Sequence, residues 1–489
     1  MERSLLLRNI IFFIVVLGFF FPLVYLLLFV PQLQWQWDSS LPRILQGALI
    51  QALYSSFLSL SLALLSGLGL LSLRERLSGT LQLSIRILIV LPSFLPPIFV
   101  VLLGTRALSF LPTGLWGIVF FHSLMNFGLV AVFIEKILAS KASAWALLGR
   151  VEGLPKPRLI FQGVLPGLRK ELTLLFYYLF MTFFLSFSIP LLVGGHYYGG
   201  VEVFIYEKIF LLGQWGPALA YSLNLTFLFF ILTLLLPKLH LGSIEARPYE
   251  AGLSYLAYPW AWAFALLPPF FLLFGLGVGL PESLLANMEG LSWLSVQQTL
   301  ILGLSTALSI FIIFSLLAFI FPSPRKGRWF FALVPPSWVI VGFSLMLLGS
   351  NEIYWTLIKC SFGLSLLFVP YLYRLVFHQE LNDLRRQVEV ARVCGVPWGR
   401  IFFYVLWPQL LPTISFLSGI GGFWACGDFA LSGMVLGENT HLALLMKNFL
   451  MNYRVDQAFV VLIPLVAVSL FVFLIFQGLS LVCRKSLNS

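Results

Sequence analysis

Few side chains in this sequence could do chemistry, and they are widely spaced. Asp428 lies in an apolar stretch, and the residue 242 positions before it is Ser186. His122 and Asn126 are four residues apart, so a helix would place them on one face. The five histidines and four cysteines are scattered, without the spacing of a metal site, and no GxxxxGK[ST] nucleotide loop occurs. The residues alone predict no catalytic centre, no metal site and no cofactor.

Composition decides which elements must carry these polar groups. The chain has 489 residues, of which 60% are hydrophobic and 10% are charged. A soluble domain carries roughly 25% charged residues and could not bury so much apolar surface. We therefore predict a polytopic membrane protein whose solvent is the lipid bilayer. The net charge of +11 does not indicate a nucleic-acid partner, because Lys and Arg fall in short clusters between apolar stretches.

The apolar stretches predict an all-α protein with twelve transmembrane helices. The runs lack the period-two alternation of a β-barrel. They begin after Arg3 and Arg8 with a helix that we expect to be retained rather than cleaved as a signal peptide. The expected spans are roughly 9–30, 45–72, 84–105, 115–136, 173–194, 217–237, 253–279, 294–321, 330–349, 354–377, 411–436 and 457–482. Most of the 30 Lys and Arg then lie on one side, which predicts that both termini are inside.

Two long segments on the inner side, 139–171 and 378–410, are copies of one another. They align without a gap at an offset of 242 residues, which is close to half the chain. The identical pairs are Arg150/Arg392, Val151/Val393, Gly153/Gly395, Pro155/Pro397, Arg158/Arg400, Phe161/Phe403, Pro166/Pro408 and Leu168/Leu410. We infer two tandem six-helix repeats, 1–245 and 246–489, with the same orientation in the membrane.

The second of these loops has the composition of a docking element. Val388–Cys394 predicts a short helix, Gly395 permits a sharp turn, and Pro397 suits the start of another helix that carries Arg400. A single copy could equally be an amphipathic helix lying on lipid headgroups. Two matched copies favour docking, and they imply two equivalent partners on the cytoplasmic side.

The pattern Glu389-x-Ala391-x3-Gly395, with Pro408 thirteen residues after the glycine, resembles the Glu-Ala-Ala loop of ABC importer permeases. The segments 187–195, 201–206 and 427–429 are similar to the fused permeases for thiamine and ferric ion. The resemblance implies type I permease repeats, coupling helices that contact two ATPase subunits, and a periplasmic substrate-binding protein. The first loop departs from the pattern, because Leu147 and Gly149 stand where Glu389 and Ala391 would be. This departure predicts a weaker first docking surface.

The polar residues inside the spans have two interpretations each. Asp428 could line a pathway that attracts a cation, or it could be a structural partner of another helix. The matching Ser186 would make such a pathway asymmetric. His122 and Asn126 could line it too, although interhelical hydrogen bonds are favoured for them. His196 and His441 could contact a periplasmic binding protein, although solvated loop positions are favoured for them.

The sequence thus favours the membrane-spanning permease of an ATP-driven importer, which is not itself an enzyme. The ATP would be hydrolysed by a separate protein. The alternative is an ion-coupled secondary transporter of a small solute, which would need intramembrane charges beyond Asp428. A membrane enzyme would need a cluster of His, Asp or Glu at one membrane face, and the sequence offers none.

Overall fold

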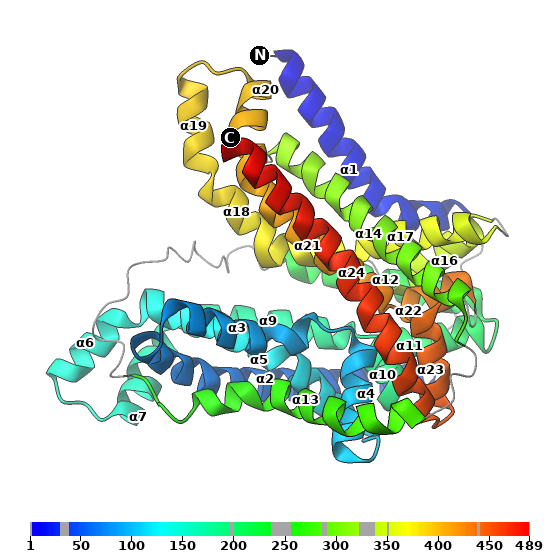
Figure 1. Ribbon diagram of the computed structural model, residues 1–489, viewed down its shortest axis with the longest axis horizontal. Coiled ribbons are helices and arrows are strands. Elements are labelled where there is room, and N and C mark those ends of the chain that lie inside the picture. Colours follow the sequence, from blue (N-terminus) through cyan, green and yellow to red (C-terminus); the bar gives the residue numbers. More distant parts are fainter. Residues whose placement is uncertain are drawn as a thin grey trace. The chain divides into compact units, whose positions relative to one another are not determined.

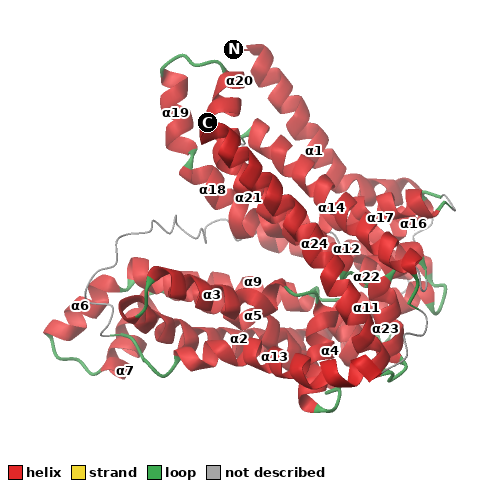
Figure 2. Ribbon diagram, in the orientation of Figure 1, coloured by secondary structure: helices red, strands yellow, loops and turns green. Residues whose placement is uncertain are grey.

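The computed structural model describes residues 2–29, 39–195, 200–235, 256–285, 291–321, 338–349, 352–437 and 441–488. Within these ranges the regular structure is helical throughout (Figure 2). Eight helices in this part of the chain are long and apolar enough to cross a membrane, or up to nine if one bent pair counts as a span. A multi-pass membrane protein is therefore supported, whereas the number twelve stays a prediction.

The third and fifth expected spans are broken helices. Span 84–105 is the pair α3 (Gly79–Phe94) and α4 (Pro97–Leu108), bent by 103°. Pro96 and Pro97 explain the bend, because proline excludes the helical conformation from the residue before it. Span 173–194 divides into α9 (Arg169–Phe184) and α10 (Ser188–Val193). The ninth expected span also contains two adjacent prolines, Pro335 and Pro336, and both lie outside the described residues.

The helices, which are labelled in Figure 1, form two compact units. The first, here called the α5 unit, comprises Asp38–Phe204 and Lys238–Leu285. In it α2 (Leu41–Arg76) packs along α5 (Gly114–Lys141), with α9 and α13 (Trp262–Leu285) beside α2. Gly69 permits the close approach of α2 to Ala261 and Trp262, where any side chain at position 69 would collide with backbone atoms.

The second unit, here called the α14 unit, comprises Met1–Trp37, Ile205–Pro237 and Ala286–Ser489. Its helices include α1, α12 and α14, and α11 has residues in both units. Their bounds are α1 Glu2–Phe29, α11 Gly200–Phe210, α12 Trp215–Leu235, α14 Trp293–Ile320, α16 Trp338–Leu347, α17 Ile353–Leu372, α21 Trp407–Cys426, α22 Ala430–Leu436, α23 Leu442–Met451 and α24 Val455–Asn488.

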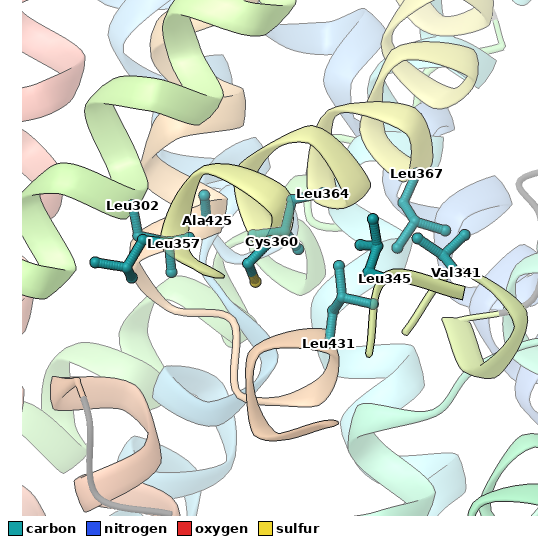
Figure 3. Packing of buried hydrophobic residues seen from close by; sticks show 9 residues of the cluster. All are labelled: Leu302, Val341, Leu345, Leu357, Cys360, Leu364, Leu367, Ala425 and Leu431. Atoms are coloured by element: carbon teal, nitrogen blue, oxygen red, sulfur yellow. The ribbon is translucent and has the colours of Figure 1, made fainter. Parts of the chain in front are cut away.

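The core of the α14 unit is a cluster of aliphatic side chains around α17. Leu357, Cys360, Leu364 and Leu367 of that helix meet Leu431 of α22 in this cluster (Figure 3). The remaining members are Leu302, Val341, Leu345 and Ala425. The short helices α16 and α22 are thereby fixed against the longer ones by buried apolar surface and close packing.

The first helix of each proposed repeat packs with the unit that contains the other repeat's loop. Helix α1 packs against α14 and α16, whereas α13 packs against α2, α3, α4 and α5. The first helix of the first half of the sequence therefore belongs to the α14 unit, and the first helix of the second half belongs to the α5 unit. The division at residue 245 concerns duplication of the sequence rather than packing, and it stays a prediction.

Candidate functional site

The two loops that match in sequence have the same secondary structure at the same offset of 242 residues. In the α5 unit, α6 spans Ser143–Val151, α7 spans Lys156–Leu159 and the π-helix η1 spans Ile160–Val164. In the α14 unit, α19 spans Arg385–Val393, α20 spans Trp398–Ile401 and η4 spans Phe402–Leu406. The short helices α8 (Leu165–Gly167) and α18 (His378–Asp383) complete the two loops. The local backbone is therefore that of two copies of one element.

Each loop turns at its glycine. Gly153 has φ +64° and Gly395 has φ +75°, in the left-handed region that favours glycine. The residue after each glycine donates its backbone N–H across the turn: Leu154 to the Gly149 carbonyl at 2.9 Å, and Val396 to the Ala391 carbonyl at 3.1 Å. These bonds close the end of the preceding helix, as in a Schellman motif.

Around the turns the loops expose apolar side chains at matched positions. Val151 is 78% exposed and Val393 is 89% exposed, and the pairs Leu148/Val390 and Phe161/Phe403 are exposed as well. Isolated exposed apolar residues are ordinary, but the same three at matched positions of two loops form a candidate contact surface, here called the loop patch. Arginines border it in both loops, all exposed: Arg150, Arg158, Arg392 and Arg400.

The other loop residues that the sequence singled out lie beside this patch. Pro155 and Pro397 are exposed and stand directly before α7 and α20, one position earlier than the first-turn placement expected for Pro397. Glu389 is exposed and Ala391 is half-buried. Pro166 is exposed in α8, and the matching Pro408 is half-buried at the start of α21.

The departure of the first loop from the Glu-Ala pattern has a structural explanation. A Cβ at position 149 would lie 2.4 Å from Leu159 Cδ2, so an alanine at this position, as the second loop has in Ala391, would require the Leu159 side chain to shift. A further matched pair differs in chemistry. Gln409 Nε2 donates to Gln387 Oε1 at 2.8 Å in the second loop. At the same positions in the first loop, Gly167 packs against the Trp145 ring. A Cβ on Gly167 would lie 3.3 Å from Trp145 Nε1.

One carboxyl of the second loop has an altered acidity. Burial of Glu380 on α18 raises the pKa of its carboxyl above the usual range, and the nearby negative charge of Asp383 raises it further. The group is only partly buried, so we attach no stability effect to this shift.

Asp428 is buried in the break between α21 and α22. Its Oδ2 accepts the backbone N–H of Ser432 at 2.9 Å, and its Oδ1 accepts that of Ala430 at 3.3 Å. The Ser432 hydroxyl in turn donates to the Asp428 carbonyl at 2.6 Å. The carboxylate therefore caps the first turn of α22, where backbone N–H groups lack helical partners. Its contacts are to its own chain segment rather than to the neighbouring helix that the sequence suggested.

Ser186 occupies the matching break in the first half. It is half-buried between α9 and α10, and α10 begins 242 residues before α22. The Ser186 N–H donates to the Phe183 carbonyl at 3.3 Å, as the Asp428 N–H does to that of Ala425 at 3.2 Å. The two breaks have one backbone geometry, and only the second carries a carboxylate.

His122 and Asn126 share a face of α5, but they bond differently. His122 is 1% exposed, its ring stacks on Phe183 with centroids 4.5 Å apart, and its Nδ1 lies 3.4 Å from the hydroxyl oxygen of Ser55 on α2. This is an interhelical contact, as the favoured interpretation predicts. Asn126 instead donates from Nδ2 to the His122 carbonyl at 3.0 Å, within its own helix.

The remaining histidine expectations have mixed outcomes. His196 lies outside the described residues. His441 is not a solvated loop residue, because it is fully buried and its Nδ1 accepts the Ala443 N–H at 3.2 Å at the start of α23. Among the described residues, no three His, Cys, Asp or Glu side chains are grouped so that they could hold a metal ion.

Two loop residues outside the predicted set make long-range contacts. Lys156 and Trp398 stand 242 residues apart, and each contacts a segment far away in the sequence. They differ in type, so a search for identical pairs passes over them. The repeat offset is the only sequence signal that links them.

Comparison with known proteins gives one match. Neither the curated proteins nor the solved structures include a significant relative of the chain. Residues 329–484 match the model of the family described as binding-protein-dependent transport system inner membrane component. The matched segment contains the second loop, its turn at Gly395 and the break at Asp428. In a chain of apolar helices, this match supports a membrane-embedded permease subunit of an ABC importer.

Proposed function

We propose that the chain contains both permease repeats of an ABC importer in one polypeptide. Each repeat contributes six spans, with both termini inside, and two ATPase subunits bind the two loops on the cytoplasmic side. A periplasmic binding protein delivers a small solute of the ferric-ion or thiamine class, which crosses the bacterial inner membrane. This assignment extends the family match from residues 329–484 to the whole chain.

The duplicated loop patch carries the proposal. A symmetric pair of ATPase subunits requires two equivalent surfaces, and Val151 and Val393 stand at the most exposed apolar positions of two loops with one backbone. Hydrophobic side chains at the centre and arginines around them are the usual composition of a protein–protein contact. A helix lying on lipid would not require a closed glycine turn at the same place in both copies.

The mechanism follows from this placement. ATP-driven closure of the ATPase pair would draw the two loops together, and the helices joined to them would change the opening of the pathway from one side to the other. Asp428 and Ser186 sit in breaks of the fifth span of each repeat. Irregular backbone at membrane depth is tolerated where it is packed in protein or lines water, which makes these breaks the proposed pathway positions, with His122 and Asn126 as further candidates.

Site-specific crosslinking tests the proposed docking. Single cysteines are placed at Val151 and Val393 in a background without native cysteines, and the membranes also contain a co-expressed candidate ABC ATPase subunit. We expect both positions to crosslink to the ATPase. A cysteine at Tyr453, which is 83% exposed in the turn before α24, is the control, because the topology places it outside.

Uptake measurements separate this function from the alternative. An importer of this class requires ATP and the binding protein, whereas an ion-coupled transporter responds to an ion gradient alone. Uptake that persists without ATP and collapses with an ionophore would reject the proposal, as would a lack of crosslinks from both loop positions.

A further inference from the structure

The second loop is joined to the N-terminal helix through a stack of charged and aromatic groups. The Arg8 guanidinium on α1 lies 4.1 Å from the centroid of the Trp398 ring on α20, and the Arg392 guanidinium of α19 lies 5.0 Å from the same ring. A guanidinium above an indole face is attracted by the ring quadrupole. Trp398 therefore connects α1 to the helix that carries the loop patch.

Arg8 also binds the end of α14. Its Nε donates to the Ile320 carbonyl at 2.8 Å, and its Nη2 donates to the Ile320 and Phe321 carbonyls, the latter at 3.0 Å. Phe321 ends the helix with φ +41°. The last carbonyls of a helix lack helical partners and carry partial negative charge, so a cation is favoured there. The start of α1 is thus fixed to both α14 and the second loop.

The first loop makes a corresponding contact, but here the loop supplies the cation and the partner segment supplies the ring. Lys156, which stands 242 residues before Trp398, lies with its Nζ 5.7 Å from the ring centroid of Tyr258 and donates to the Ala257 carbonyl at 3.2 Å. Tyr258 lies in the segment just before α13, and its N–H donates to the Leu68 carbonyl of α2 at 3.3 Å. The start of α13 is thus fixed to both α2 and the first loop.

The two arrangements share their positions and differ in their chemistry. Each joins one loop position, 156 or 398, to the start of the first helix of the other proposed repeat. In the second loop the ring is on the loop and the cation is on α1, whereas in the first loop the cation is on the loop and the ring is in the segment just before α13. A contact retained while its two components have changed places indicates that the contact itself matters.

We propose that these cation–ring pairs, Arg8–Trp398 and Lys156–Tyr258, are positioning contacts that make the first helix of each repeat move with the loop of the other. This proposal rests on the proposed function, because it assumes that the loops receive movement from an ATPase. It adds a route by which that movement reaches α1 and α13 directly, beside the route along the chain from each loop into its own adjoining spans.

Single substitutions remove the ring of one pair and the charge of the other. Trp398→Leu removes the ring and leaves the Arg8 bonds to α14, and Lys156→Met removes the charge but keeps a similar length. We expect ATP-driven uptake per assembled molecule to fall about fivefold in each, the factor that corresponds to roughly 1 kcal/mol for one cation–ring contact. ATP hydrolysis should continue, so the number of ATP molecules used per solute should rise. Phe270→Leu on α13, which removes a 60% exposed ring, is the control and should retain wild-type uptake.

Exchange of the components distinguishes a positioning role from simple loss of stability. Lys156→Trp and Tyr258→Arg are made singly and together, so that the double variant gives the first loop the arrangement of the second. We expect each single variant to lose uptake and the double variant to recover to within about twofold of wild type, as restored cation–ring pairing requires. A double variant no better than the singles would overturn the proposal, as would Trp398→Leu and Lys156→Met variants with unchanged ATP use per solute.

The unmodified chain distinguishes failure of this proposal from failure of the function beneath it. If the wild-type chain neither crosslinks to the ATPase nor shows ATP-driven uptake, the importer function is rejected. If the wild-type chain does both, and the pair variants behave like wild type, only the positioning contacts are rejected.

Discussion

The loops 139–171 and 378–410 share the secondary structure of 143–164 and 385–406 but are held by different side-chain pairs. Gln387 and Gln409 bond to each other in the second loop, whereas Trp145 packs on Gly167 in the first. The turn glycines keep the same conformation in both. The comparison teaches that the turn is specified by the glycine, while the contact that braces it can be polar or apolar. Absence of the Glu-Ala signature in the first loop therefore does not indicate a different structure.

What does differ is the surface that each loop offers to a partner. Trp145 and Leu147 are exposed in the first loop at the positions of Gln387 and Glu389 in the second. At these two positions the first loop presents apolar side chains, whereas the second presents an amide and a carboxylate. Unequal engagement of two ATPase subunits would therefore arise from surface chemistry rather than from backbone geometry, and the following experiments are designed to separate these two causes.

The largest expected effect is all-or-none labelling of the two loops from one side. Cys394 and position 152 match at the repeat offset, and both are exposed. With the other native cysteines replaced, Cys394 and Glu152→Cys should each react with an impermeant maleimide in inside-out vesicles only. Asn439→Cys should react in intact cells. Labelling of either loop from outside, or of Lys326→Cys from outside, would contradict the twelve-span topology.

The turn glycines should show the largest effect on transport. Gly395→Val should abolish uptake, because a β-branched residue resists φ +75°. Membrane insertion should persist, because the surroundings are open, with no atom within 4 Å of an added Cβ. The left-handed conformation costs about 1–2 kcal/mol for an ordinary residue. Gly395→Asn is the control, since Asn tolerates this region.

Gly153→Val sharpens the same comparison. The backbone strain is equivalent at φ +64°, so a milder loss of uptake would assign the difference to a weaker first docking surface. Equal losses in the two valine variants would show that the loops engage equally and that the asymmetry inferred from the sequence is wrong.

A charge in the loop patch should have an intermediate effect. Val393→Asp and Val151→Asp each place a carboxylate in the proposed apolar contact, and we expect roughly tenfold weaker recovery of the ATPase on purification, equivalent to ~1.4 kcal/mol. The isosteric Val393→Thr and Val151→Thr serve as controls. Wild-type recovery in both aspartate variants would place the ATPase contact elsewhere.

The smallest expected effect concerns the caps at the two helix breaks. Asp428→Ala removes the acceptors of two N–H groups and should cost about 1 kcal/mol, visible as a lower melting temperature in detergent. Ser186→Ala should cost less. Asp428→Asn retains one acceptor oxygen, so reduced uptake at normal abundance would identify a role for the charge. Full uptake at normal abundance would remove Asp428 from the pathway.

Much of the local structure could be predicted from the sequence. Apolar length indicated the membrane helices, and the 242-residue offset indicated two loops with helices on each side of a glycine turn. Pro96 and Pro97 account for the break in the third span by the same kind of local effect. These features depend on neighbouring residues, because helix propensity, proline sterics and glycine conformations act within a few positions. The burial of His441 was not predictable, since a loop histidine carries no local mark of what packs over it.

The sequence by itself determined the solvent of this protein, the proline break in its third span and the repetition of its loops. Tertiary structure alone decided that α1 packs with α14 and that α13 packs with α2. It also brought Arg8 to Trp398 and Lys156 to Tyr258. In lipid, apolar surface does not select one neighbour over another, so helix partners are chosen by close packing and polar contacts between residues distant in sequence. Such contacts leave no periodic pattern along the chain, and they are seen only when the helices are placed in space.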